Sequence, residues 1–491
     1  MTHHLLPVLR LLGWLMACFA LTMTLPLAAA LYYDDGMAPA FMLGMALTLG
    51  CGLLLGLGLS RYKRELQPRH ALLLVVSTWT LLPLAASIPL MQGLAEVGRH
   101  LTMAQAYYEA SSGLSTAGGT VLSGLDGLPT SINVWRCYLQ WLGGLGILIL
   151  VVAVLPMLGV GGSQLYRAEI AGPLKEGKLT PRVAQTATGL WAVYATLSTA
   201  CALAYWAAGM SPLDALLHMF TTVSLGGLSS HDASIGYFNS AAVEWVAVAF
   251  MFISAGNFAL YFTAVQRRRW LAPLANPEWR ATMLTLAGCG AFMAVWVAAS
   301  SPEGGDTLTL MRHGFFHTIS IATTTGYSTT DYEVWPLFGP VLILLLSTFA
   351  TSAGSAGGGI KMIRLLVLLK QTAHELNRMT HPHAVRPVRI GHMPISGQTV
   401  LAVLAFVVVY GVTTLTLALL LLLTGMDPLS AATAAWASVN CVGPGLGEVG
   451  PARNFAGLTD IQLWLCSLGM VMGRLEFLSF VALLLPSFWR R

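Results

Sequence analysis

The chain has 491 residues, of which 56% are apolar and only 10% are charged. Soluble domains carry roughly 25% charged residues, so this composition excludes an ordinary soluble protein and indicates a membrane protein. The net charge of +5 does not indicate a nucleic-acid partner, because basic loops that set topology and contact anionic lipids account for it.

Apolar runs of about 20 residues can cross the roughly 30 Å hydrocarbon layer as helices. The sequence predicts ten such spans, near residues 7–31, 37–60, 71–92, 132–158, 184–210, 241–265, 281–300, 336–370, 397–424 and 461–488. The first run could instead be a secretory signal, because Arg10 precedes an apolar stretch that ends near Ala30. This stretch is longer than a signal core, so a retained span is favoured.

The basic residues indicate how the spans are oriented. Alternate loops and the two termini together hold 21 of the 26 Lys and Arg residues, and loops of this kind face the cytoplasm. Both termini are therefore predicted to be cytoplasmic. The opposite loops are acidic, and an acidic mouth concentrates cations.

The polar residues form no pattern typical of an enzyme or of a resident metal. The seven Cys and twelve His residues have no ligand or redox spacing, and His218, His313 and His317 are interpreted as surface or packing residues of short helices. The run GLGEVG at 445–450 has the spacing of a dinucleotide-binding motif, but no strand pattern precedes it. We therefore expect no catalytic activity and no covalently bound cofactor.

A repeat appears when the outward-facing loops are compared. After the third, fifth, seventh and ninth spans, a segment of about 12 residues precedes a small polar and glycine-rich run. These runs are SSGLSTAGGT (111–120), TTVSLGGLSS (221–230), IATTTGYSTT (321–330) and SVNCVGPGLG (438–447). When they are aligned on Gly118, Gly226, Gly326 and Gly443, the intervals are 108, 100 and 117 residues, which predicts four copies of one unit.

Irregular backbone at membrane depth is tolerated only where protein buries it or where it lines a water-filled path. Rings of carbonyl oxygens can replace the hydration shell of a monovalent cation, and glycine permits the backbone angles that such rings need. The runs could also be ordinary turn-forming loops. Four occurrences at the same place in each unit favour an ion path.

These runs belong to longer motifs, and the motifs together span nearly the whole chain. They are YEASSGLSTAGGT (108–120), WRCYLQWLGGLGI (135–147), QLYRAEIAGPLKEGKLTPR (164–182), TTVSLGGLSSHDASIGYF (221–238), ATTTGYSTTDY (322–332), TSAGSAGGGIK (351–361), NCVGPGLGEVGP (440–451) and GRLEFLSFVALLLPSFWRR (473–491). With them, the sequence resembles the Trk/Ktr/HKT superfamily of potassium transporters, and most closely its bacterial TrkH membrane subunits.

The resemblance implies an all-α polytopic protein with ten transmembrane helices and four re-entrant pore helices. Two N-terminal helices (1–69) would precede four pseudo-symmetric pore repeats around one ion path, at 70–170, 171–275, 276–390 and 391–491. It also implies potassium uptake across the bacterial cytoplasmic membrane by a homodimer. The partner would be a cytoplasmic nucleotide-binding regulatory subunit of the TrkA type.

Carried over by position, the resemblance implies an ion filter of four short segments. They are Thr116, Ala117 and Gly118; Ser224, Leu225 and Gly226; Thr324, Thr325 and Gly326; and Cys441, Val442 and Gly443. In this superfamily, glycine at the key position of every loop goes with potassium selectivity, whereas serine in the first loop goes with sodium permeation. We expect K⁺ and Rb⁺ to pass. Because Ala117, Leu225 and Val442 have no hydroxyl, some passage of Na⁺ is compatible with the sequence.

The eighth apolar run contains GSAGGG at 354–359, a composition that disfavours helix. The sequence therefore predicts a break in this span, and the resemblance places an intramembrane gating loop near 352–360. The residues assigned to the gate are Gly354, Ser355, Gly357, Gly358, Gly359 and Lys361. Close helix packing through small residues is the alternative, but three consecutive glycines make it less favourable.

Arg474 lies within the last apolar run, where a charged residue costs roughly 2.5 to 3.5 kcal/mol on insertion scales. It should therefore face a polar cavity or a partner. The resemblance assigns it to the gate, as an electrostatic barrier on the axis beneath the filter. The alternative is a buried ion pair, for which Glu244 on the sixth span is the candidate.

Two further questions stay open from the sequence. A secondary transporter that couples K⁺ to H⁺ or Na⁺ through broken helices is the alternative function, although parallel repeats around one axis favour a pore. The basic segments 361–394 and 159–183 are candidate docking surfaces for the regulatory subunit, and solvated cytoplasmic charge explains them equally well.

Overall fold

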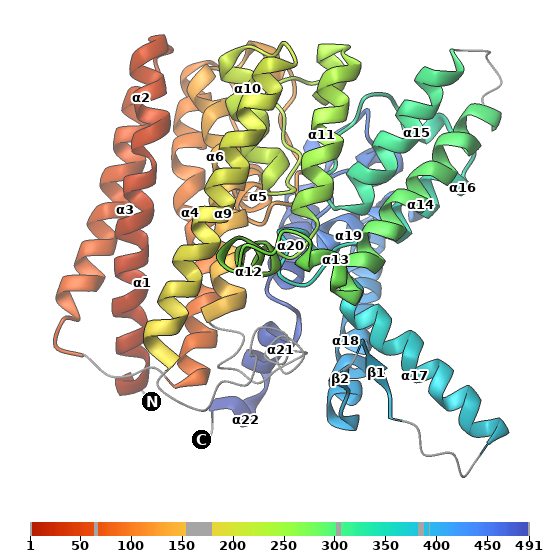
Figure 1. Cartoon of the computed structure of the whole chain (residues 1–491). Coiled ribbons are helices and arrows are strands. Elements are labelled where there is room, and N and C mark those ends of the chain that lie inside the picture. Colours follow the sequence, from red (N-terminus) through yellow and green to blue (C-terminus); the bar gives the residue numbers. More distant parts are fainter. Residues whose placement is uncertain are drawn as a thin grey trace.

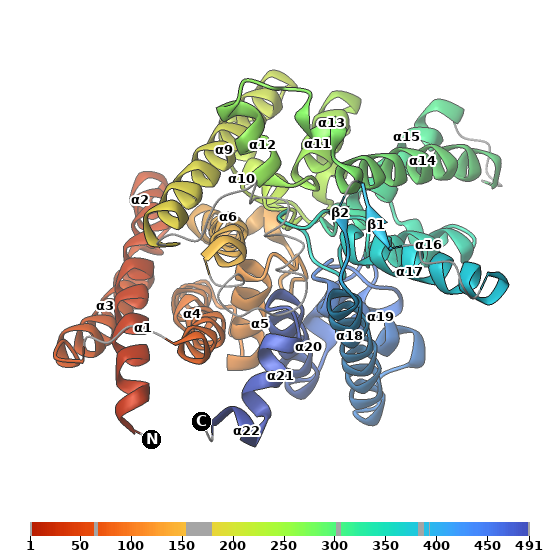
Figure 2. The ribbon, with the colours of Figure 1, turned by 60° about the horizontal axis from the view of Figure 1, so that its bottom comes forward.

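The described part of the chain is a set of helices grouped around a central region, as Figures 1 and 2 show. The computed structural model describes residues 2–62, 67–153, 179–300, 306–381, 387–391 and 393–489. Most of the candidate docking loop 159–183 and of the motif at 164–182 lies outside these residues, as do positions 382–386 and 392 of the segment 361–394.

Three N-terminal helices, α1 (Thr2–Thr22), α2 (Thr24–Tyr33) and α3 (Ala38–Gly58), lie at one edge of the molecule (Figure 1). Small residues let α1 and α3 pack closely. A Cβ atom on Gly13 would lie 2.6 Å from the backbone nitrogen of Gly56, and one on Gly52 would lie 2.7 Å from that of Ala17. This is the packing that small residues four positions apart permit between membrane helices.

The rest of the chain repeats one order of elements: a long helix, a short helix, an irregular segment and a further helix. Within the described residues, this further helix is broken in the second, third and fourth sets. The first set is α4 (Pro68–Glu96), α5 (Met103–Leu114) and α6 (Thr130–Ala153), and the second is α9 (Leu179–Ala207), α10 (Pro212–Val223), α11 (Ala241–Ser254) and α12 (Phe258–Gln266). The third is α14 (Pro277–Ser300), α15 (Thr307–Ala322), α16 (Phe338–Leu346) and α17 (Met362–Thr380), with the short α13 (Ala272–Ala275) before it. The fourth is α18 (Gly397–Leu423), α19 (Pro428–Asn440), α20 (Asp460–Arg474), α21 (Leu478–Leu484) and α22 (Pro486–Trp489).

The short helices α5, α10, α15 and α19 begin in the same way. The side chains of Thr102, Ser211, Asp306 and Asp427 each accept a hydrogen bond from a backbone N–H of the first turn, which is the preferred N-cap arrangement. These helices have 12, 12, 16 and 13 residues. At 1.5 Å per residue, none is long enough to cross the hydrocarbon layer.

Among the described helices, six are long and apolar enough to cross a membrane, or seven if α11 and α12 count as one span. The predicted span 7–31 comprises α1 and α2, which Met23 alone separates and which together form one candidate span, Leu5–Tyr33. Three other predicted spans are not single helices. The span 241–265 bends by 83° between α11 and α12, the span 336–370 is interrupted between Leu346 and Met362, and the span 461–488 ends its first helix at Arg474. The predicted break at GSAGGG is therefore present, whereas the other two breaks were not predicted.

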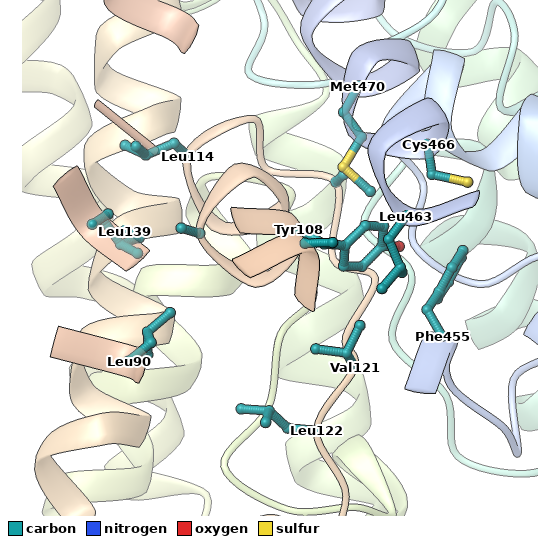
Figure 3. Packing of buried hydrophobic residues seen from close by; sticks show 14 of the residues in the cluster. Leu90, Tyr108, Leu114, Val121, Leu122, Leu139, Phe455, Leu463, Cys466 and Met470 are labelled. Carbon is teal, nitrogen blue, oxygen red and sulfur yellow. The ribbon is translucent and has the colours of Figure 1, made fainter. Parts of the chain in front are cut away.

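Apolar packing joins the first set of helices to the fourth. Figure 3 shows Tyr108 of α5 against Phe455 and beside Met470 of α20, and the ring centroids of Tyr108 and Phe455 are 5.1 Å apart. The backbone N–H of Phe455 also donates to the carbonyl oxygen of Thr120 at 2.8 Å. Burial of an aromatic side chain contributes about 1.5 to 3 kcal/mol, so this contact holds the loop after α5 in place.

A small antiparallel sheet follows α17. It consists of β1 (Arg389–Ile390) and β2 (Met393–Pro394), with Arg389 opposite Pro394 and Ile390 opposite Met393. The hairpin leads directly into α18, so it connects the third set of helices to the fourth.

Candidate functional site

The chain leaves each of the four short helices with the same backbone conformation. A residue within two positions of the helix end has a positive φ, with 55° at Thr116, 54° at Leu225, 64° at Thr324 and 54° at Cys441. The first three follow the helix cap, and Cys441 is itself the cap of α19. A positive φ is uncommon for residues other than glycine. Its recurrence at four equivalent places indicates one shared structural requirement. We call residues 116–118, 225–227, 324–326 and 441–443 the converging strands.

The backbone corrects the predicted alignment of the second strand. Each strand ends on a glycine with positive φ, namely Gly118 (83°), Gly227 (73°), Gly326 (86°) and Gly443 (94°). Gly226 has no such angle, so the alignment on Gly226 is wrong by one residue. Two consecutive glycines occur in SLGGLS, and either could be matched from sequence alone.

Hydrogen bonds at the helix ends support this register. The middle residue of each strand donates its N–H to a helix carbonyl five residues earlier, from Ala117 to Ser112 (2.9 Å), Gly226 to Thr221 (2.8 Å), Thr325 to Ser320 (2.8 Å) and Val442 to Ala437 (3.0 Å). Gly226 is therefore the counterpart of Ala117. Ser224 is a helix cap, and its hydroxyl donates back to the carbonyl oxygen of Phe220 at 2.8 Å.

The four strands adjoin one another in a closed ring. A Cβ atom on Gly118, Gly227 or Gly326 would come closer than 3.0 Å to the middle carbonyl oxygen of the next strand, which belongs to Gly226, Thr325 and Val442 respectively. A Cβ atom on Gly443 would lie 3.0 Å from the carbonyl oxygen of Ala117, so the fourth strand returns to the first. The structure thus brings all four predicted segments together.

A hollow of about 90 Å³ opens on the glycine side of the ring, and we call it the vestibule. The glycines of all four strands line it, as do residues that follow them. The later residues include Thr120, Ser229, Ser328 and Asn454. The hollow therefore leads from the polar loops to the ring.

A buried ion pair supports the first two strands, and sequence reasoning missed it. Arg136 Nε lies 2.7 Å from Glu109 Oε1, and both side chains are fully buried. Glu109 also accepts from the N–H of Val121 at 2.9 Å, and Arg136 donates to the carbonyl oxygen of Ser229 at 3.2 Å. Such a pair is tolerated where further hydrogen bonds satisfy both charges. The sequence signal was one isolated charge in each of two otherwise apolar segments.

Gln140 of α6 holds the second strand. Its Nε2 donates to the carbonyl oxygen of Gly226 at 2.8 Å, and its Oε1 accepts from the N–H of Leu228 at 3.1 Å. The side chain is fully buried, so it fixes the direction of one ring carbonyl. A single glutamine in an apolar segment was not identified from the sequence.

The three histidines interpreted as packing residues make specific hydrogen bonds. His218 Nε2 lies 3.0 Å from Ser229 Oγ, and His313 Nδ1 lies 2.8 Å from Thr329 Oγ1. His317 Nε2 lies 3.1 Å from the carbonyl oxygen of Thr330. Each histidine therefore braces the segment that follows its own converging strand, and the packing interpretation was incomplete.

His231 lies in the loop that lines the vestibule and contacts two acidic residues. Its Nε2 is 3.1 Å from Asp214 Oδ1, and its Nδ1 contacts Asp126. Its ring stacks on Tyr237 with centroids 3.5 Å apart. Burial acts to lower the pKa of His231, but hydrogen bonds and the charges of Asp214 and Asp126 outweigh it and raise the pKa. Through these contacts, His231 links the loops after the first and second strands.

The segment between α16 and α17, residues 347–361, is the inner loop. Its first half is bonded to other helices: Ser352 donates its N–H to the carbonyl oxygen of Ala255 at 2.9 Å, and the Gly354 carbonyl accepts from Phe258 at 3.1 Å. Its second half closes on itself, because Lys361 Nζ donates to the carbonyl oxygen of Gly357 and to Ser355 Oγ (3.4 Å).

The inner loop contacts the converging strands on the side opposite the vestibule. The N–H of Gly358 donates to Thr324 Oγ1 at 2.9 Å. The carbonyl oxygen of Gly358 accepts from Thr351 Oγ1 at 3.0 Å, and Gly359 follows with a φ of 77°. All the residues predicted for the gate, apart from Arg474, therefore belong to one loop against the start of the third strand.

Arg474, at the end of α20, is 3% exposed and contacts the inner loop. Its Nη1 donates to the carbonyl oxygen of Ala356 at 2.7 Å, while Nε and Nη2 have no hydrogen-bond partner in the described part of the chain. The alternative of an ion pair with Glu244 is wrong, because Glu244 accepts from Arg312 Nε at 2.8 Å. Arg474 therefore places a charge that no carboxylate of the described residues balances beside the loop.

The fold and the site together define a class of protein. Apolar membrane helices surround a ring of backbone carbonyls, and no group of His, Cys, Asp or Glu that could hold a metal ion occurs among the described residues. This arrangement is that of a membrane protein that moves ions.

Comparison with known proteins gives the family. Residues 37–490 match the TrkH family model, described as a cation transport protein. The chain is 43% identical over 484 residues to the Trk system potassium uptake protein TrkH of Halomonas elongata, covering 99% of each chain. It is 40% identical over 490 residues to the protein of that name from Escherichia coli, with 99% of this chain and 100% of the relative covered.

The similarity extends to the Trk system potassium uptake protein TrkG of Escherichia coli, at 35% identity over 491 residues, covering 100% of this chain and 99% of the relative. The crystal structure of the potassium transporter TrkH from Vibrio parahaemolyticus matches with a TM-score of 0.91 and 39% identity over 99% of each chain. This chain belongs to the TrkH family, whose members are ion transporters and not enzymes. The predicted resemblance is confirmed.

Proposed function

We propose that this chain takes up K⁺ across the bacterial cytoplasmic membrane as the ion-conducting subunit of a Trk-type system. One observation carries the proposal: four converging strands adjoin in a closed ring, each glycine next to the middle carbonyl of the following strand. Rings of carbonyl oxygens can take the place of the water around K⁺. The potassium uptake named in the relatives' descriptions supports this choice of ion.

In this proposal, the ion ligands are the backbone carbonyls of the corrected strands. They belong to Thr116, Ala117 and Gly118; Leu225, Gly226 and Gly227; Thr324, Thr325 and Gly326; and Cys441, Val442 and Gly443. Rb⁺ passes as K⁺ does, and Na⁺ passes less well. Ser224 is not a ligand, because it is the cap of α10.

The inner loop is the proposed gate, and Arg474 is the proposed barrier. A cationic side chain without a carboxylate partner beside the ion path repels cations, and its hydrogen bond to Ala356 ties it to the loop. Movement of the loop opens the path in this account. A cytoplasmic nucleotide-binding subunit of the TrkA type drives the movement, and the described part of 361–394 is a candidate docking surface for it.

The proposed topology has both termini in the cytoplasm, with two N-terminal helices and four pore repeats divided at 69, 170, 275 and 390. Both termini lie at the same side of the molecule (Figure 1), which supports this orientation together with the distribution of basic residues. The protein works as a homodimer in this proposal.

The proposal is tested by Rb⁺ uptake in a bacterium that lacks its own potassium uptake systems. We expect the wild-type chain to restore uptake and Gly118→Ser to lower the preference for K⁺ over Na⁺. The reason is that φ is 83° at Gly118 and a Cβ atom there would collide with the carbonyl of Gly226. Absence of wild-type uptake, or an unchanged ion preference in a well-expressed variant, would overturn the proposal.

A secondary transporter that couples K⁺ to H⁺ or Na⁺ is the second candidate, and the broken helix pair α11 and α12 is the observation that favours it. Four repeats that converge on one ring favour a pore instead. Single-channel steps in planar bilayers distinguish the two, because a coupled transporter gives a fixed ion stoichiometry and no steps.

A further inference from the structure

The inner loop is hydrogen-bonded directly to one of the converging strands. The N–H of Gly358 donates to Thr324 Oγ1 at 2.9 Å, and both residues are buried. Thr324 stands at the first position of the third strand, the end of the strand that faces the loop. The proposed gate and the proposed filter therefore share a contact through one side chain.

The backbone of the loop is fitted closely against Thr324 and against the residues that directly precede the third and fourth strands. A Cβ atom on Gly357 would lie 3.1 Å from both the carbonyl oxygen of Thr323 and the hydroxyl of Thr324. A Cβ atom on Gly358 would come closer than 3.0 Å to the carbonyl oxygen of Asn440. Side chains at these positions would force the loop away, so the glycines are what allow the Thr324 hydroxyl to reach the N–H of Gly358.

Other bonds of the loop do not involve the strands. Ser352 and Gly354 are bonded to the bend between α11 and α12, and Ala353 donates its N–H to Glu278 of α14. Gly354 and Gly359 have positive φ angles of 75° and 77° and enclose the part of the loop that contacts the strand. A rotation at these two glycines would move residues 355–358 and break the bond to Thr324 without breaking the bonds of residues 352–354 to the α11–α12 bend and to α14.

Among the described residues, this hydrogen bond to the inner loop occurs at the third strand alone. In the equivalent positions, Leu225 has no hydroxyl, and the sulfur of Cys441 donates to the carbonyl oxygens of Ser438 and Met470. Thr116 donates its N–H to the carbonyl oxygen of Gly113, and no hydrogen bond joins it to the inner loop in the described part of the chain. The four strands therefore differ at their inner ends. The inner loop is hydrogen-bonded to the third strand and not to the other three in the described part of the chain.

We propose that Thr324 is the positioning residue that couples the inner loop to the filter. The inference rests on the proposed function. Its hydroxyl holds the loop in the closed position, and opening of the loop releases that hydroxyl at the inner end of the third strand. Opening of the loop and release of the Thr324 hydroxyl at the third strand then occur together. A buried N–H without an acceptor is unfavourable, so loss of the hydroxyl shifts the loop toward open conformations in which water reaches Gly358.

The test compares three variants of the full chain in planar bilayers without any regulatory subunit. We expect Thr324→Ala to raise the open probability about 3- to 10-fold, the ratio that corresponds to one neutral hydrogen bond. Thr324→Ser keeps the acceptor and should behave as wild type. Thr318→Ala is the matched control, because the hydroxyl of Thr318 is also buried but donates to the carbonyl oxygen of Gly314 within α15 at 2.7 Å, so the open probability should stay unchanged.

A second measurement is independent of conduction. Hydrogen exchange of the peptide that contains Gly358 should be faster in Thr324→Ala than in Thr318→Ala or Thr324→Ser. Thr324→Cys, which keeps the size of the side chain but has a weak acceptor, should resemble Thr324→Ala and replaces it if that variant does not fold. Equal open probabilities in Thr324→Ala and Thr318→Ala, or failure of Thr324→Ser to match wild type, would overturn the coupling.

The two proposals fail in different ways. If the wild type conducts K⁺ and Thr324→Ala neither opens more often nor exchanges faster at Gly358, the coupling is wrong and the proposed function stands. If the wild type passes no K⁺ or Rb⁺ at all, the proposed function is wrong, and the coupling inference falls with it.

Discussion

Replacement of Gly227 by alanine tests the corrected register of the second strand. Gly227 has a φ of 73°, and a Cβ atom on it would come closer than 3.0 Å to the carbonyl oxygen of Thr325, a backbone atom that is itself part of the ring. An alanine in left-handed conformation costs roughly 1 to 2 kcal/mol, and an overpacked buried site costs about 1 to 3 kcal/mol. The total is about 2 to 5 kcal/mol.

The strain falls on the ring itself, because the new methyl group would displace the carbonyl oxygen of Thr325, a proposed ion ligand. Since 1.4 kcal/mol corresponds to a factor of ten, the preference for K⁺ over Na⁺ should fall at least about tenfold in Gly227→Ala. Reversal potentials under bi-ionic conditions measure the ratio. Gly127→Ala is the control, because its φ is not positive and a Cβ atom there would meet nothing within 4 Å.

Gly226→Ala separates the two possible registers. Gly226 has no positive φ, and a Cβ atom on it would meet the side chain of Gln140 rather than a ring carbonyl. We therefore expect a smaller loss of ion preference than in Gly227→Ala, with a lower yield of folded protein. A large loss of preference in Gly226→Ala together with a normal Gly227→Ala would refute the reasoning.

Three further predictions concern the charged groups. Arg474→Ala should raise Rb⁺ flux in proteoliposomes several-fold, because it removes a positive charge that forms no ion pair with a carboxylate of the described residues. Equal or lower flux in a folded variant would contradict the barrier role. Glu109→Gln should destabilise the protein by about 3 to 5 kcal/mol, because it leaves the buried charge of Arg136 unpaired, and thermal unfolding in detergent measures the loss. Because its neighbours raise the pKa of His231, its ion pairs stabilise the fold fully below the unfolded pKa of about 6.5 and weaken as pH rises through the folded pKa. The unfolding temperature should therefore fall by about 1 to 3 °C when the pH rises above the folded pKa of His231. His231→Gln should show no such fall.

The parts of the fold that could be predicted are those with a local sequence signal. Apolar runs predicted where long helices lie, and the consecutive glycines at 357–359 predicted the break between α16 and α17. The bend between α11 and α12 was missed because the span is mostly apolar, with Gly256 and Asn257 at the bend to mark it. A single pair of small or polar residues is a weak signal in a membrane helix.

The parts of the site that were missed depend on contacts between distant segments. Glu109 and Arg136 form an ion pair but are 27 residues apart in the sequence. The local sequence around either residue does not indicate that the two side chains meet. The pairing of Arg474 with Glu244 was wrong for the same reason, since Arg312 of α15 takes that carboxylate. The register at Gly226 was wrong because consecutive glycines are equivalent in sequence and differ only in their φ angles.

The most direct measurement is the location of bound Rb⁺ by anomalous diffraction from crystals grown with Rb⁺ in place of K⁺. The account predicts anomalous peaks inside the ring, surrounded by the backbone carbonyls of strands 116–118, 225–227, 324–326 and 441–443. Crystals that contain Rb⁺ only at acidic surface side chains, with the ring empty, would contradict it.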